Sequence, residues 1–144
     1  MGKQFGVAER LRAVDLGGRV PPHNRDAEAA VLSAVLTDNA TLDVVLPLLP
    51  NGEAFYIEAN RRVYDVCIAL REKGQPADVM TVGEVLRARD ELQLVGGLAY
   101  LARIVDATPS VAHVGAHAQI VVDLYRRRRL IEVLQVEAAA GYTD

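Results

Sequence analysis

The stretch from about Val111 to Ala140 constrains the fold more than any other part of the chain. It contains no proline and a single glycine, Gly115. A helix over this stretch would be roughly 40–45 Å long, which exceeds the ~30 Å breadth of a small domain. We therefore predict one long C-terminal helix, part of which projects from the body of the protein and needs a partner.

The apolar residues of this helix fall into two rows. One row is a heptad-like seam, with His117 and Arg127 at two of its positions, and its large apolar members are Ile120, Leu124, Ile131 and Leu134. The other row covers only the first half and consists of Val114, Ala118, Val121 and Tyr125. The first half of the helix thus has two surfaces to bury, and the second half has one.

Composition favours a single helical domain. The chain has 144 residues, of which 51% are hydrophobic and only 5% aromatic, so its core must consist of Leu, Val, Ile and Ala. The single cysteine, Cys67, excludes an internal disulfide and a multi-cysteine zinc site; we expect it in the core of a cytoplasmic protein. No apolar run has the length of a membrane span, and the net charge of −3 argues against nucleic-acid binding as the main role.

The pattern predicts an all-α fold, a small globule of about five helices followed by the long C-terminal helix. We expect a flexible leader over residues 1–20 with a short helix near Val7–Val14, a globular subdomain over 21–110, and the long helix over 111–144. Asn24 is the expected N-cap of the first helix, and Gly74 the C′ residue of the third. The five helices are expected at about 25–36, 40–46, 57–73, 81–89 and 97–105.

The clearest predicted helix start lies near residue 81. Thr81 and Glu84 have the spacing of a capping box, and Met80 and Val85 that of a hydrophobic staple. The fifth helix should follow Gly96-Gly97 and bury Leu98 on its core-facing stripe.

The sequence contains no catalytic or cofactor motif. There is no G-x-x-x-x-G-K-[ST] loop, and neither of the two lysines, Lys3 and Lys73, lies in a glycine-rich phosphate cradle. His113 and His117 are four residues apart, but no third metal ligand accompanies them, so we expect structural roles. We predict no enzymatic activity, metal or cofactor for this chain.

Four consecutive arginines are the strongest charge feature: Arg126, Arg127, Arg128 and Arg129. Consecutive residues on a helix point in four directions, so this run cannot form one flat phosphate-binding face. A solvated collar is the preferred interpretation, and contact with nucleic acid or with an acidic partner is the alternative.

Three ordered blocks of the sequence resemble the bacterial replicative DNA helicases of the DnaB family. Residues 21–32 (PPHNRDAEAAVL) resemble P-P-H-S-x-E-A-E-x-x-V-L. Phe55-Tyr56, Arg61 and residues 74–81 (GQPADVMT) resemble F-Y-x-x-x-H-R and G-x-P-x-D-x-x-T. Residues 96–101 (GGLAYL) and 108–110 (TPS) resemble G-G-x-A-Y-L and T-P-S-x-x-N-V. Asn60 replaces the usual histidine, Asp26 the usual glutamate and His113 the usual asparagine.

The resemblance implies that this chain is the N-terminal domain of such a helicase. The ATPase motor of the helicase lies in a separate domain, and the N-terminal domain meets DNA only indirectly, through the full-length helicase. In this family a helical globule precedes a helical hairpin, the domains pair through their hairpins, and six form a collar to which primase docks through its C-terminal domain. The long helix would then be the first arm of the hairpin, ending at Gly141. The family's primase-response positions match Asp26, Asp78 and Tyr100 here.

The predicted function is therefore non-catalytic assembly of the helicase and recruitment of primase. Two alternatives remain open from the sequence. One is a free-standing helical adaptor or regulator, and the other is a single-stranded DNA-binding module that uses the arginine run.

Overall fold

The computed structural model describes residues 20–106 and 111–143, with side chains as far as Tyr142. Within these ranges it contains helices and no strand, which confirms the all-α prediction. The elements are α2 (Arg25–Thr37), α3 (Thr41–Val45), the 3-10 turn η1 (Gly52–Ala54), α4 (Glu58–Glu72), α5 (Val79–Ala88), α6 (Leu92–Val95), α7 (Gly97–Asp106), the 3-10 turn η2 (Val111–His113) and α8 (Val114–Thr143).

The chain divides into two compact units. Of the described residues, 24–106 and 111–122 form one unit, and 20–23 and 123–143 form the other. The predicted helix at Val7–Val14 and the Thr108-Pro109-Ser110 turn lie outside the described residues. The limits predicted for the leader, globule and long helix stay predictions.

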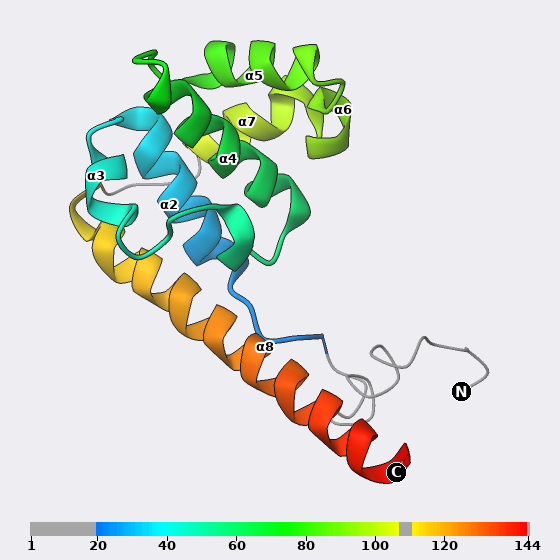
Figure 1. Ribbon diagram of the computed structural model, residues 1–144. Coiled ribbons are helices and arrows are strands. Elements are labelled where there is room, and N and C mark those ends of the chain that lie inside the picture. Colours follow the sequence, from blue (N-terminus) through cyan, green and yellow to red (C-terminus); the bar gives the residue numbers. More distant parts are fainter. Residues whose placement is uncertain (1–19, 107–110, 144) are drawn as a thin grey trace. The chain divides into compact units, whose positions relative to one another are not determined.

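Helix α2 lies in the middle of the larger unit, where it packs against α4 and α7 (Figure 1). Asn24 caps it as predicted, since its side-chain oxygen accepts a hydrogen bond from the Ala27 N–H at 2.9 Å. Nine of the thirteen residues of α2 are buried. A helix buried on nearly all sides has to be small and apolar, which explains its run of Ala, Val and Leu.

Helix α4 ends as the sequence predicts. Gly74 has a φ of +69°, a left-handed conformation that glycine adopts without strain from a Cβ. The Gly74 N–H donates to the Arg71 carbonyl, and the Gln75 N–H donates to the Leu70 carbonyl, both at 2.9 Å. These two bonds make a Schellman motif, which satisfies carbonyls that the helix end would otherwise leave open.

The predicted start of α5 was wrong by three residues. Asp78 is the N-cap: its carboxylate accepts from the Thr81 N–H at 2.8 Å, and the Thr81 hydroxyl accepts from the Asp78 N–H at 2.9 Å. Thr81 is therefore the third residue of the helix, because Asp78 is itself a good capping residue and lies earlier in the chain. Met80, assigned to a staple, is 79% exposed.

The segment from Leu92 to Asp106 contains one helix that the sequence did not reveal. Four-residue α6 is too short to show a period, and the φ angles of +106° at Gly96 and +72° at Gly97 then redirect the chain into α7. The face of α7 that packs into the core also differs from the predicted face. Leu101 and Ile104 are buried, whereas Leu98 is exposed.

Helix α8 begins close to the predicted position and passes straight through Gly141 to Thr143. The expected helix end at Gly141 is therefore wrong. Glycine tolerates helical dihedrals at a cost of about 1 kcal/mol, and three alanines precede it here. Among the described helices, none combines the length and apolar character that crossing a membrane requires.

Gly52 and Gly141 provide a matched pair of substitutions for testing this fold. A Cβ on Gly52 would lie 2.6 Å from the Arg61 carbonyl oxygen, whereas nothing lies within 4 Å of a Cβ on Gly141. Gly52→Ala should therefore lower the free energy of unfolding by about 1–3 kcal/mol, and Gly141→Ala should leave it unchanged or raise it by up to about 1 kcal/mol. Urea denaturation followed by circular dichroism measures both. Equal midpoints for Gly52→Ala and the parent chain would contradict this packing.

Candidate functional site

A buried carboxylate joins α2 to the start of α4. The Glu28 side chain on α2 is 2% exposed and accepts hydrogen bonds from the backbone N–H groups of Tyr56, at 2.7 Å, and Ile57, at 3.2 Å. Ile57 is the N-cap of α4 and makes no capping bond with its own side chain. Glu28 therefore supplies from another helix the acceptor that the start of α4 lacks.

Asn60 extends this contact to α7. Its side-chain N–H donates to Glu28 Oε1 at 2.9 Å, and its Oδ1 accepts from the Tyr100 hydroxyl. Burial raises the pKa of Tyr100, so the hydroxyl keeps its proton and acts as the donor. We call Glu28, Asn60 and Tyr100 the Glu28 junction. Its bonds run in one direction, from Tyr100 through Asn60 to Glu28.

The three residues assigned to partner response do not form one cluster. Asp26 is exposed in the first turn of α2, two residues before Glu28, which Tyr100 reaches only through Asn60. Asp78 follows Ala77, whose backbone N–H and carbonyl both bond the Asn39 amide just beyond the other end of α2. The thirteen residues of α2 span roughly 20 Å, so Asp78 lies far from Asp26.

Asp78 and Tyr100 each have a structural role in the described chain. Asp78 caps α5, and Tyr100 donates to Asn60. Among the three, Asp26 is the residue whose side chain is exposed and makes no hydrogen bond to residues 20–106 or 111–143. Substitution of Asp78 or Tyr100 should therefore lower the stability of the fold.

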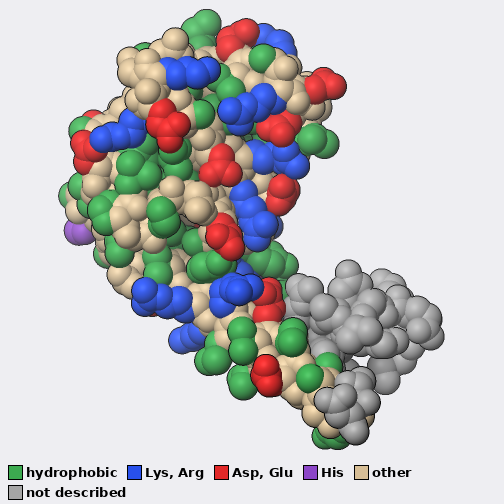
Figure 2. All heavy atoms as spheres, viewed as in Figure 1, with side chains coloured by type: hydrophobic (Ala, Val, Ile, Leu, Met, Phe, Trp, Pro, Cys, Tyr) green, Lys and Arg blue, Asp and Glu red, His purple; other side chains and the backbone are tan. Residues whose placement is uncertain are grey.

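The two apolar rows of α8 differ in burial. Val114, Ala118 and Val121 of the shorter row are buried, together with Val122. In the seam, Leu124 and Ile131 are half-buried, whereas Ile120 is 39% and Leu134 58% exposed. Further exposed apolar side chains on this part of the helix are Leu130, Val133, Val136 and Tyr142. Figure 2 shows hydrophobic side chains gathered on the C-terminal half of α8.

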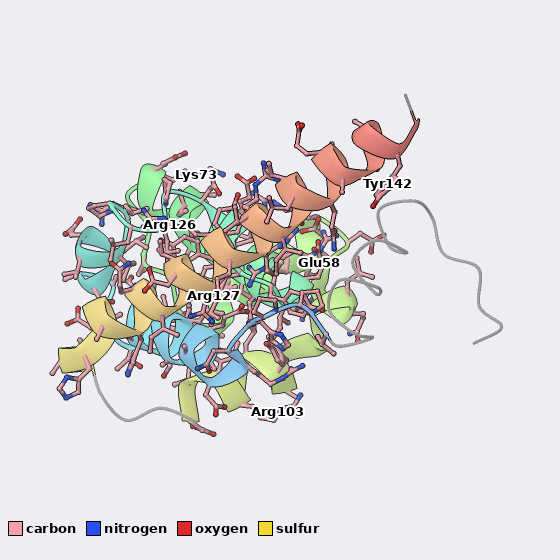
Figure 3. The ribbon with its side chains drawn as sticks, turned by 90° about the horizontal axis from the view of Figure 1, so that it is seen from below. Glu58, Lys73, Arg103, Arg126, Arg127 and Tyr142 are labelled. Carbon is pink, nitrogen blue, oxygen red and sulfur yellow. The ribbon has the colours of Figure 1, made fainter. Side chains whose placement is uncertain are left out.

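The arginine run does not behave as one solvated group. Arg128 is buried, donates to the Pro22 carbonyl at 2.8 Å and lies with its guanidinium 5.8 Å from the Tyr125 ring. Arg129 is paired with Glu132 at 3.0 Å. Arg126 and Arg127 are exposed and leave α8 in different directions (Figure 3). The prediction of a solvated collar of four arginines is therefore wrong for Arg128, whose hydrogen bond connects α8 to the chain at Pro22.

Other reactive side chains have structural positions. Cys67 is fully buried in α4, as predicted, and burial raises the pKa of its thiol to about 12, so the reactive thiolate is scarce at neutral pH. The rings of His113 and His117 lie 6.4 Å apart between centroids. No group of three or more potential metal ligands occurs among residues 20–106 and 111–143.

Sequence reasoning missed the Glu28 junction, although one signal was present. Glu28 precedes Val31, Leu32 and Val35 at the spacing of one helix face, and that face is otherwise apolar. A carboxylate on a core-facing stripe requires several hydrogen-bond donors, because an unpaired buried charge is unstable. Its partners at Tyr56 and Ile57 are backbone groups, which no side-chain pattern identifies.

Glu28→Gln tests the junction. Glutamine offers one carbonyl oxygen in place of two carboxylate oxygens, so at least one of the three donors loses its acceptor. We expect the free energy of unfolding to fall by about 2–4 kcal/mol. Glu58→Gln is the matched control: Glu58 is an exposed residue of α4 paired with Arg61 and Arg62, and its loss should cost less than about 1 kcal/mol. Similar urea midpoints for the two variants would contradict a structural role for Glu28.

Comparisons with known proteins agree on one family. The model of the DnaB-like helicase N terminal domain matches residues 20–123. The chain is 38% identical over 130 residues to the replicative DNA helicase DnaB of Treponema pallidum (strain Nichols), covering 90% of this chain and 30% of that protein. It is 36% identical over 129 residues to the DnaB of Geobacillus stearothermophilus, covering 87% of this chain and 27% of that one. The chain thus spans less than a third of the length of these relatives.

A solved structure gives the same answer at the level of the fold. The crystal structure of the N-terminal domain of DnaB helicase from Mycobacterium tuberculosis superimposes with a TM-score of 0.83 at 34% sequence identity. The match covers 86% of this chain and 88% of that structure. Sequence and fold therefore lead to one conclusion: the chain belongs to the DnaB-like helicase N-terminal domain family.

Proposed function

We propose that this chain is a non-catalytic assembly and docking domain of a cytoplasmic replicative DNA helicase. In this proposal it pairs with further copies through α8, contributes to the N-terminal collar of a hexamer and recruits primase. The observation that carries the proposal is the exposed apolar surface of α8 in a chain of this family. The sequence contains no phosphate-binding loop, so ATP hydrolysis would belong to another part of the helicase.

Support for self-association comes from the seam on α8. Ile120 and Leu134 are exposed, and Leu130 nearby is 59% exposed. Exposed leucines and isoleucines repeated along one helix are typical of a surface that another helix covers. The partner would be α8 of a second copy, together with the second arm of the hairpin that the family resemblance implies.

Support for primase recruitment is less direct and comes from the family. We propose Asp26 as a contact with primase, and Asp78 and Tyr100 as residues that act indirectly by holding α5 and α7 in place. Their described hydrogen bonds favour this division, since Asp78 holds the start of α5 and Tyr100 is bonded to Asn60.

Single-stranded DNA binding through the arginine run has less support. Arg128 and Arg129 already have partners in Pro22 and Glu132. Only Arg126 and Arg127 then remain for phosphates, and binding to a strand without sequence preference usually combines an extended basic groove with aromatic stacking.

Leu134→Asp tests the association surface. A charge on the seam would have to be desolvated in a helix–helix contact, so the dissociation constant of the dimer should rise by at least about tenfold. Sedimentation velocity over a range of chain concentrations measures this shift. Leu94→Asp, at a leucine of α6 that is 68% exposed, is the matched control and should leave association unchanged. A wild-type chain that stays monomeric throughout would contradict the proposal.

Titration calorimetry with the C-terminal domain of the cognate primase tests recruitment. We expect binding with a dissociation constant of tens of micromolar or tighter, on the order of −6 kcal/mol or below. An absence of binding both to this chain and to the intact helicase would overturn the primase role and leave the assembly role standing.

A further inference from the structure

Two guanidiniums that form no ion pair within residues 20–106 and 111–143 lie near Tyr100. Arg25 is the first residue of α2, one helical turn before Glu28, and Arg103 is one turn after Tyr100 on α7. The Arg103 guanidinium lies over the Tyr100 ring, 5.7 Å from its centroid, and Arg103 lies at the outer edge of α7 in Figure 3. Arg25 is close enough to lower the pKa of Tyr100, against the larger effect of burial. We call Arg25, Tyr100 and Arg103 the Arg25–Arg103 patch.

The hydrogen bonds of the Glu28 junction run inward from the Tyr100 hydroxyl, which limits the groups of the patch that a partner can contact. The Tyr100 hydroxyl donates inward to Asn60, so its proton is not available to a molecule on the surface. The outward parts of the patch are the ring and the two guanidiniums. Asn60 and Glu28 hold the Tyr100 ring in one orientation. Because the Arg103 guanidinium lies over this ring, its position is fixed as well.

The charges of the patch are not neutralised within the described chain. Neither Arg25 nor Arg103 forms an ion pair with a carboxylate of residues 20–106 or 111–143. Other arginines of the same unit do, namely Arg61, Arg62, Arg71 and Arg87. With no ion pair in the part of the chain that the structure describes, these two guanidiniums have donors to offer to carboxylates, which guanidinium groups bind in a bidentate manner.

We propose that the Arg25–Arg103 patch docks an acidic segment of the partner protein, with carboxylates on Arg25 and Arg103 and an apolar contact on the Tyr100 ring. This inference rests on the proposed recruitment of primase and names the chemistry of the primase surface: glutamate or aspartate side chains beside an apolar one. Arg25 and Arg103 then make the charged contacts, and Tyr100 contributes its ring, while its inward-bonded hydroxyl only positions that ring.

An acidic protein segment fits the patch better than a nucleic acid does. The patch has two basic groups, and Asp26 lies exposed next to Arg25. A carboxylate so close repels a continuous phosphate backbone, whereas a protein partner can place its charges selectively. The net charge of −3 for the whole chain also opposes nucleic-acid binding.

Binding of the cognate primase C-terminal domain to charge-matched variants tests the proposal. Arg25→Gln with Arg103→Gln should raise the dissociation constant by about tenfold or more. The matched control is Arg87→Gln with Arg89→Gln, which removes the same charge from exposed positions of α5 and its C-cap. This control should change the dissociation constant by less than about twofold. Raising NaCl from about 50 to about 300 mM should weaken wild-type binding more than that of the Arg25/Arg103 variant.

Tyr100→Phe separates contact from positioning. It retains the ring and removes only the inward hydrogen bond, so binding measured on the folded variant should stay within about threefold of wild type, while the urea midpoint falls. A loss of affinity as large as that of the Arg25/Arg103 variant would make the hydroxyl the contact and overturn the proposal.

Two other outcomes would also overturn it. Equal affinity of the wild-type chain and the Arg25/Arg103 variant for primase would overturn the proposed docking surface but not the recruitment of primase. A wild-type chain that does not bind primase would overturn both proposals. A fluorescent oligothymidine of roughly 20 nucleotides serves as the nucleic-acid probe. Binding of it that disappears in the Arg25/Arg103 variant would assign the patch to nucleic acid instead.

Discussion

The larger unit of this domain depends on one buried carboxylate. Glu28 connects three helices that are distant in sequence, because it lies on α2, accepts from the first backbone groups of α4 and reaches α7 through Asn60. A carboxylate without donors would be strongly destabilising in this position, and donors without it would leave the start of α4 uncapped. Each side of the contact therefore requires the other, which fixes how α2, α4 and α7 meet.

The local chemistry of the helix ends was largely readable from the sequence. Asn24 and Gly74 act through hydrogen bonds to residues within a few positions, so their roles follow from short patterns. The start of α5 was misplaced because Asp78 and Thr81 both have capping chemistry, and a pattern alone does not rank them. Helix α6 is too short to carry a period, and Gly141 resembles a helix end that the preceding alanines override.

The long-range features could not be predicted in the same way. The Glu28 junction uses backbone donors that lie 28 and 29 residues away, and Arg128 uses the carbonyl of Pro22. Neither contact has a spacing that a sequence pattern records. The consequence for function is a division of roles: residues with conspicuous chemistry, such as Asp78, Tyr100 and Arg128, hold the fold. We propose that partners bind to two surfaces without catalytic chemistry, the seam of α8 and the Arg25–Arg103 patch.

Native-state hydrogen exchange at the Tyr56 and Ile57 amides tests the central role of Glu28 most directly. These two N–H groups precede the hydrogen-bonded part of α4, and without Glu28 they would exchange as the amides of an open helix end do. If the junction holds the three helices together, both amides should exchange only through unfolding of the whole unit, with the same free energy as the amides in the middle of α4. Exchange of Tyr56 and Ile57 through local opening, while the middle of α4 stays protected, would contradict this account.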